Sequence, residues 1–195
     1  MTSPFTIRRL RSAVGTLLLA AILLGSFVPT GFAVEKDAPM PAKVMAAFIY
    51  KFISYIQWPE EAGTGEFKIT VLGDSLLAGP LEEIAGRKTV AQKPIVFAHV
   101  EKLADLTPCD ILVLSGHWSE QLAQVTDSLG DAPTLIVTHC PGCAGNGAGI
   151  NFVTREGRIR FEVNVAALQR AQLVPAARFL KLAIIVDDEK SKEQP

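Results

Sequence analysis

The most restrictive feature of this sequence is a short strand-like run, Asp110–Leu114, in which four successive apolar residues leave no polar face. Such a strand is covered on both faces, which is typical of parallel sheets flanked by helices. A chain of 195 residues suits one domain of this kind with a leader in front of it.

Strand-like runs alternate with segments of helical periodicity along most of the chain. The expected strands are Phe67–Leu72, Ile95–Val100, Asp110–Leu114, Thr134–Thr138, Ile150–Thr154 and Arg158–Val163. The expected helices are Ala42–Trp58, Pro80–Ala85, His117–Leu129, Val165–Ala171 and a last one from Pro175 to about Val186. Asn164 can cap the helix over Val165–Ala171. The order predicts a single α/β domain with a mixed sheet, flanking helices and, near the C-terminal part, an antiparallel hairpin at one edge.

The N-terminal residues have the pattern of an export signal. Arg8, Arg9 and Arg11 form a basic segment, and the apolar run Ala13–Val28 follows it. This run is short for a membrane span, and Gly31-Phe32-Ala33 offers the small residues that a signal peptidase accepts. We therefore expect a signal peptide over 1–33, cleaved after Ala33, and a periplasmic domain over 34–195 with an ordered core of about 40–187.

The charge balance argues against a nucleic-acid binder. The chain carries 19 Lys and Arg against 20 Asp and Glu, and the mature part becomes mildly acidic when the three leader arginines are removed. A nucleic-acid binder normally shows a basic face.

The second notable motif is His139-Cys140-Pro141-Gly142-Cys143, at the start of a glycine-rich loop. Cysteines of exported proteins normally oxidise, so Cys140 and Cys143 are candidates for a disulfide that stiffens the loop. A thiol oxidoreductase would need a helix after the first cysteine, and a structural zinc site would need a fourth ligand. We therefore predict no metal and no cofactor. A disulfide that is sensitive to the redox state of its surroundings remains open as a variant of this interpretation.

Cys109 makes the number of cysteines odd, since the chain has three. It stands before the buried strand, so we expect a buried thiol, and pairing with a loop cysteine or with another chain remains open.

Alternation along Arg158–Asn164 predicts two different faces of one strand. Ile159, Phe161 and Val163 share one face, and the polar face carries Arg158, Arg160, Glu162 and Asn164. A solvated strand face would explain the pattern, but arginine also suits carboxylate or phosphate recognition. These four residues are our candidates for binding a partner or ligand.

A Gly73-Asp74-Ser75-Leu76 turn resembles the nucleophile block of GDSL-type esterases. Ser75 would need a histidine base oriented by a carboxylate. None of the three histidines follows an aspartate by three positions, as that family requires, and its oxyanion block is absent. We therefore expect no enzyme, and keep the esterase using Ser75 as the alternative.

Taken in order, several weak motifs resemble the YfiR-like family of exported proteins. The matching segments are Ala46–Phe52 with Trp58-Pro59, Ile69–Asp74, Cys109–Leu112, Gly149–Phe152, Arg158–Asn164 and Arg178–Ala183. Together they cover nearly the whole mature chain.

The resemblance implies a periplasmic regulator. Its namesake represses an inner-membrane YfiN-like diguanylate cyclase and so lowers cyclic-di-GMP, and it is associated with dimers and with disulfide-dependent stability. A small-molecule-binding sensor module for a histidine kinase is a further alternative for this chain, because the resemblance extends to domains of that kind. The short Cys140–Cys143 spacing departs from a two-disulfide pattern, so the full redox mechanism is not carried over.

Overall fold

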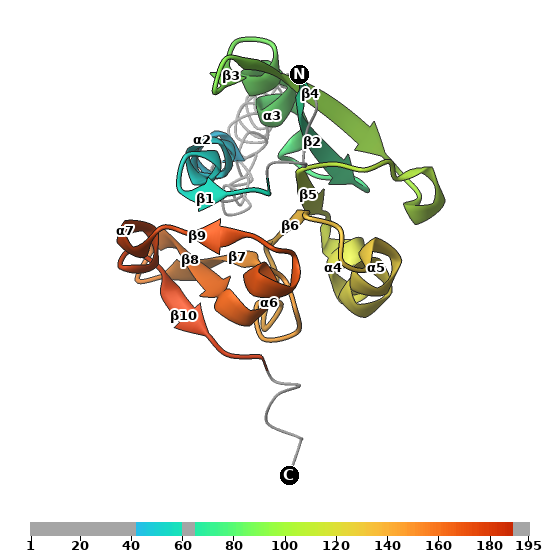
Figure 1. The fold of residues 1–195 in the computed structure, drawn as a ribbon. Coiled ribbons are helices and arrows are strands. Elements are labelled where there is room, and N and C mark those ends of the chain that lie inside the picture. The colour runs from blue at the N-terminus through green and yellow to red at the C-terminus, as the bar shows by residue number, and fades with distance from the viewer. Residues whose placement is uncertain (1–41, 60–64, 189–195) are drawn as a thin grey trace, which may run out of the picture. The chain divides into compact units, whose positions relative to one another are not determined.

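The computed structural model describes residues 42–59 and 65–188. Within these ranges an eight-stranded sheet has the order β10-β8-β7-β6-β5-β2-β4-β3, and a separate two-stranded antiparallel sheet pairs β1 with β9 (Figure 1). The predicted signal peptide lies outside the described residues.

The strands are β1 Ile56–Gln57, β2 Phe67–Leu72, β3 Thr89–Val90, β4 Lys93–Val100, β5 Ile111–Leu114, β6 Leu135–Thr138, β7 Ile150–Arg155, β8 Arg158–Asn164, β9 Val174–Pro175 and β10 Ile184–Val186. The helices are α2 Ala42–Ile53, α3 Ala78–Ala85, η1 Leu103–Asp105, α4 Gly116–Glu120, α5 Leu122–Leu129, α6 Val165–Arg170 and α7 Ala177–Leu180.

The sheet is mixed, as the sequence predicts. β4, β2, β5, β6 and β7 run parallel as neighbours, and β8 turns back antiparallel to β7. The hairpin is therefore confirmed, but it does not end the sheet. β10 pairs with β8 in parallel and forms the edge strand instead.

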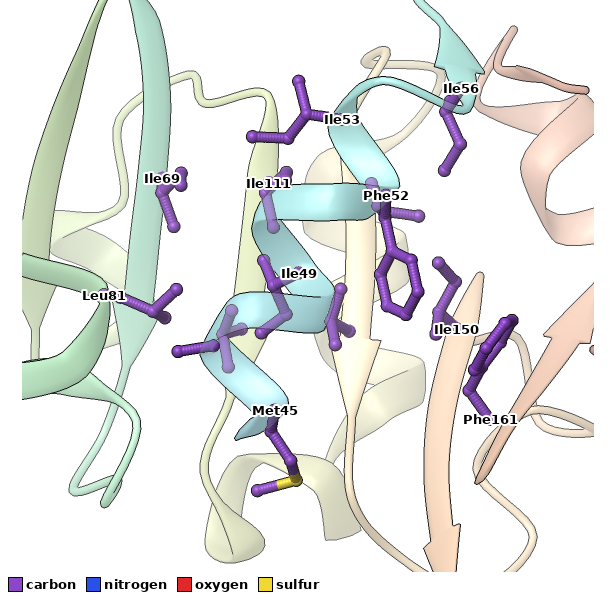
Figure 2. Close-up of a cluster of buried hydrophobic side chains, with 14 of the residues drawn as sticks. Met45, Ile49, Phe52, Ile53, Ile56, Ile69, Leu81, Ile111, Ile150 and Phe161 are labelled. Atoms are coloured by element: carbon purple, nitrogen blue, oxygen red, sulfur yellow. The ribbon is translucent and has the colours of Figure 1, made fainter. Parts of the chain in front are cut away.

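Helices cover both faces of the sheet, which explains why β5 is buried along its whole length. On one face α2 lies over the strands, and in Figure 2 the side chains of Ile49 and Phe52 point toward Ile111 of β5 and Ile150 of β7. Leu122 and Val125 of α5 pack on the other face, beside Leu112, Leu114 and Ile136.

Phe52 is the centre of an aromatic cluster in the α2-facing core. Its ring lies 5.8 Å from that of Phe152, 5.0 Å from Phe161 and 5.3 Å from Phe179, measured between ring centroids. These rings come from α2, β7, β8 and α7, so one apolar side chain joins the first helix to the last elements of the chain.

Three expected helices differ from the structure. The first ends at Ile53, because the chain then turns so that Ile56–Gln57 can pair with β9. The one expected over His117–Leu129 is two helices, α4 and α5, which meet at Gln121. The last one is the short α7 followed by β10, whose β-branched residues pair with the otherwise open side of β8.

Candidate functional site: the disulfide loop and its supports

The Cys140–Cys143 disulfide is present, as the spacing predicts, with the two Cα atoms 5.7 Å apart. Its loop joins β6 to β7 and is folded by internal hydrogen bonds, among them one from the Ala148 N–H to the Cys143 carbonyl at 3.0 Å. Cys143 and Ala144 are buried while Pro141 is exposed. The disulfide therefore holds a loop with one side in the core and the other in solvent.

The side chain of Asn151 in β7 is hydrogen-bonded to the backbone of Cys140, the first cysteine of the disulfide. Its Nδ2 donates to the carbonyl oxygen of Cys140 at 2.8 Å, and its Oδ1 accepts from the N–H of Cys140 at 3.0 Å. The Thr138 hydroxyl also donates to the same Oδ1, at 2.9 Å. Asn151 is fully buried, so these bonds satisfy an amide that would otherwise be costly to bury.

Glu162 of β8 is the next member of this network. Asn151 Nδ2 donates to its carboxylate at 2.8 Å, and Arg155 lies 3.9 Å from the other carboxylate oxygen. The Glu162 side chain is only 13% exposed. Glu162 thus makes its contacts across the hairpin, with two residues of β7.

Asn164 supports the second half of the loop. Its Oδ1 accepts from the N–H of Ala167 at 2.8 Å, which caps α6, and its Nδ2 donates to the Ala144 carbonyl at 2.7 Å. Nδ2 also lies 2.5 Å from a carboxylate oxygen of Asp188, which pairs in turn with Arg170. The predicted helix cap is present, but Asn164 is fully buried and presents no surface to a partner.

Arg158 and Arg160 are exposed at the far end of the hairpin, away from the disulfide loop. Arg158 is paired with Arg155 across the β7–β8 ladder, and the turn between them places Glu156 and Gly157 at positive φ. The four polar residues predicted as one surface therefore fall into two groups. Arg158 and Arg160 are exposed, whereas Glu162 and Asn164 belong to the hydrogen bonds that support the disulfide loop.

Sequence reasoning did not assign a role to Asn151 or to Asp188. The signal for Asn151 was available, since an amide inside the otherwise apolar run Ile150–Val153 needs a partner when it is buried. Asp188 carried no such signal, because only the folded chain brings it to Asn164.

Cys109 is free and 9% exposed. Burial raises the pKa of its thiol to about 11. A thiol of this kind is mostly protonated at neutral pH and reacts slowly, which agrees with the expected buried thiol.

Asp110 next to it is also buried, and burial raises its pKa. Its carboxylate accepts from the N–H of Lys68 at 2.7 Å, and its carbonyl accepts from the N–H of Leu135 at 2.8 Å. One residue thus joins the beginnings of β2, β5 and β6.

Among the described residues no hydrogen bond joins Ser75 to a histidine, as an esterase triad would need, although Ser75 and His139 line the same cavity. The Ser75 hydroxyl accepts from the N–H of Leu77 at 3.2 Å, a local bond within the turn. Nε2 of His99 lies 3.1 Å from the carbonyl oxygen of Gly73, and Nε2 of His117 lies 3.0 Å from the amide nitrogen of Gln121.

Among residues 42–59 and 65–188, no three acidic, histidine or cysteine side chains are placed to hold a metal ion. In the same ranges no helix combines the length and the apolar character needed to cross a bilayer.

A solved structure has a related fold. This chain is similar to the ABC domain from Streptococcus pneumonia, crystallised in complex with L-Trp, with a TM-score of 0.51 and 11% identity. The match covers 75% of this chain and 60% of that one, so this chain spans less than two thirds of that structure. At this identity the likeness concerns the fold alone.

A search of the curated proteins found no match. The YfiR/HmsC-like family model, DUF4154, matches residues 42–184. That segment begins with α2 and ends at the start of β10, so it includes the aromatic core, the disulfide loop and both supporting asparagines. The chain therefore belongs to the YfiR/HmsC-like family.

Proposed function

We propose that this chain is an exported, periplasmic regulator that binds and represses an inner-membrane signalling protein, a YfiN-like diguanylate cyclase, and so lowers cyclic-di-GMP. The observation that carries this proposal is the family match over 42–184, which extends through nearly the whole described domain. The domain boundaries go with it: a signal peptide over 1–33 and a regulatory domain over 34–195.

The mechanism is a shift of the partner's conformational equilibrium. A domain that binds only the inactive state of the cyclase stabilises that state by its differential affinity. The regulator itself performs no reaction. Its contribution is a surface of fixed shape, and the disulfide loop with its asparagine supports is suited to keeping such a surface in place.

The contact surface we propose includes Arg158 and Arg160. Both are exposed on β8, and Arg155 lies directly across the ladder from Arg158. Arg155 already has the Glu162 carboxylate at 3.9 Å, whereas the exposed guanidinium groups of Arg158 and Arg160 suit a carboxylate-bearing partner. An acidic patch on the periplasmic portion of the cyclase fits this arrangement.

Redox control is part of the proposal. Reduction of the Cys140–Cys143 disulfide by an added dithiol yields two thiols and removes one constraint on the loop. The asparagine bonds remain, so we do not expect reduction to unfold the domain. We expect it to weaken partner binding, because the loop is linked to the arginine end of the hairpin through Asn151 and Glu162, whose carboxylate lies 3.9 Å from Arg155.

The test is capture of membrane proteins on a tagged chain expressed with its own N-terminal residues. Recovery of a diguanylate cyclase supports the proposal. Recovery of a sensor kinase replaces it with the alternative of a kinase input module, and recovery of neither contradicts it.

A matched pair of variants separates a specific surface from general charge. Arg158→Ala with Arg160→Ala should release the partner. Arg87→Ala should not, because Arg87 is exposed on another part of the chain and pairs with Glu83 at 2.8 Å. Equal loss in both would contradict the assigned surface. We also propose that the chain forms a homodimer, as the family resemblance implies, and sedimentation of the purified chain tests this separately.

A further inference from the structure

The order of the parallel strands creates a crevice that the proposed function does not use. From β2 the chain passes through α3 to β4, and it then returns to β5 on the other side of β2. α3 packs in the α2-facing core through Leu81, whereas α5, after β5, packs in the opposite core through Leu122. At such a point of reversal the connections leave toward opposite faces, and a crevice opens beyond the carboxyl ends of the strands.

Two cavities lie at this point. One of about 260 Å³ is lined by the turn after β2 and the end of β5, including Ser75 and Ser115. The other, of about 600 Å³, lies between α4 and the disulfide loop and is lined by Ser119 and Cys140. Gly116 and His139 line both, so the two cavities are neighbours.

The turns that follow β2 and β5 lie in close contact beside the smaller cavity. Gly73 has a φ of +80°, and a Cβ atom there would lie 2.4 Å from the Ser115 hydroxyl and 2.6 Å from a ring carbon of Trp118. The Ser115 N–H donates to the Leu72 carbonyl at 3.0 Å. Only glycine allows this approach of the two turns, and Ser115 on one of them lines the smaller cavity.

An unused hydrogen-bonding group lies in the wall. Ser119 is 5% exposed, lines the larger cavity, and its hydroxyl has no hydrogen-bond partner in the described part of the chain. A buried hydroxyl without a partner costs free energy, which a bound ligand can recover.

The charges of the lining select the ligand. Asp74 lines the smaller cavity and Glu120 the larger, and the described residues of both linings include no lysine or arginine. Leu76, Leu77 and Leu122 supply apolar surface. This combination disfavours an anion and suits a cation with an apolar body.

We propose that the crevice beyond β2, β5 and β6 is a binding site for a small organic amine, whose ammonium group lies near Asp74 or Glu120 and whose apolar part contacts the leucines. The site is independent of the arginine surface and of any membrane partner.

The test uses three probes of similar length: pentylamine, pentanol and hexanoate. Each is titrated into the isotope-labelled full chain, purified after export, and amide shifts are followed by NMR. Pentylamine should move the amides of Ser75, Gly116 and His139 with the highest affinity, pentanol should bind more weakly, and hexanoate should bind least. No shifts at these amides, or equal affinity for the amine and the alcohol, would overturn the proposal.

Two glycines provide a matched control for the location. A Cβ atom would meet nothing within 4 Å at Gly116 or at Gly79, and both are helical positions, but only Gly116 lines the cavities. Gly116→Leu should abolish the shifts and Gly79→Leu should preserve them.

A second pair tests the charge. Asp74→Asn, at an exposed position that tolerates change, should weaken pentylamine binding by up to about fivefold, the range for an exposed charge pair. Asp105→Asn should leave it unchanged. Binding that is insensitive to both Gly116→Leu and Asp74→Asn would place the amine elsewhere and overturn the assignment.

Discussion

Asn151 pairs with the backbone of Cys140 as another strand would, since its side-chain amide both donates to the Cys140 carbonyl and accepts from the Cys140 N–H. The two residues are 11 positions apart, on either side of the disulfide loop. A buried side chain thus continues the hydrogen bonding of the sheet beyond the end of β6, where the backbone itself turns away.

Asn151→Ala should therefore destabilise the domain. The change leaves the Cys140 N–H and the Thr138 hydroxyl without their partner, and we expect a loss of about 2–4 kcal/mol in the free energy of unfolding. Urea denaturation followed by circular dichroism measures it.

The control for that variant lies in the same loop. Asn146 is exposed and makes one bond, to the Gly142 carbonyl at 3.1 Å. Asn146→Ala should cost less than about 0.5 kcal/mol. If both variants lost equal stability, the special role of Asn151 would be wrong.

Asp110 makes stability depend on pH in a defined direction. Burial raises its pKa above the ordinary 3.8, so the folded state holds a proton that the unfolded state has already lost. The contribution of this group to stability is therefore complete below the ordinary pKa and is lost as pH rises through the raised one.

Asp110→Asn removes that dependence while it keeps an oxygen that can accept from the Lys68 N–H. The stability of the variant relative to the parent chain should rise over the pH range above the ordinary pKa of 3.8. Denaturation midpoints compared across this range test it, and a difference that stays constant or falls with pH would contradict the assigned direction.

Cys109 should be almost unreactive in the folded protein. With a pKa near 11 against 9.0 for an ordinary thiol, its thiolate fraction at about pH 8 is lower by roughly a hundredfold, and burial slows access further. Iodoacetamide labelling of native and of unfolded chain, followed by mass spectrometry, measures the ratio.

The same labelling counts the thiols. Unreduced, unfolded chain should carry one free thiol, and reduced chain three, because Cys140 and Cys143 are joined. Three free thiols before reduction would show that the disulfide is not formed.

Gly73→Ala should destabilise the domain by about 2–4 kcal/mol, since the new Cβ meets the Ser115 hydroxyl and the backbone keeps a left-handed φ. Gly79→Ala is the matched change in α3, where a Cβ meets nothing within 4 Å, and should be neutral or stabilising by up to about 1 kcal/mol. Thermal unfolding of the two variants compares them, and similar midpoints would contradict the close contact.

Local features of the sequence were sufficient where the deciding interactions are also local. The apolar run before Ser115 predicts a buried strand, the spacing of Cys140 and Cys143 predicts their disulfide, and Asn164 predicts the cap of α6 because its partner is three residues away. Periodicity failed at Ile184–Val186, where apolar residues fit a helix or a strand equally well and pairing with β8 decided between them.

The sequence by itself thus determined the class of the fold, the alternation of helices and strands, and the loop closed by the Cys140–Cys143 disulfide. These features depend on interactions between residues that are close to one another in the chain. Only the tertiary structure decided that Asn151 and Glu162 support the loop, that Asp188 returns to Asn164, and that Ser75, Gly116 and His139 gather around one crevice. These groups come from separate strands and turns, and it is strand order in the sheet, which no local pattern encodes, that brings them together.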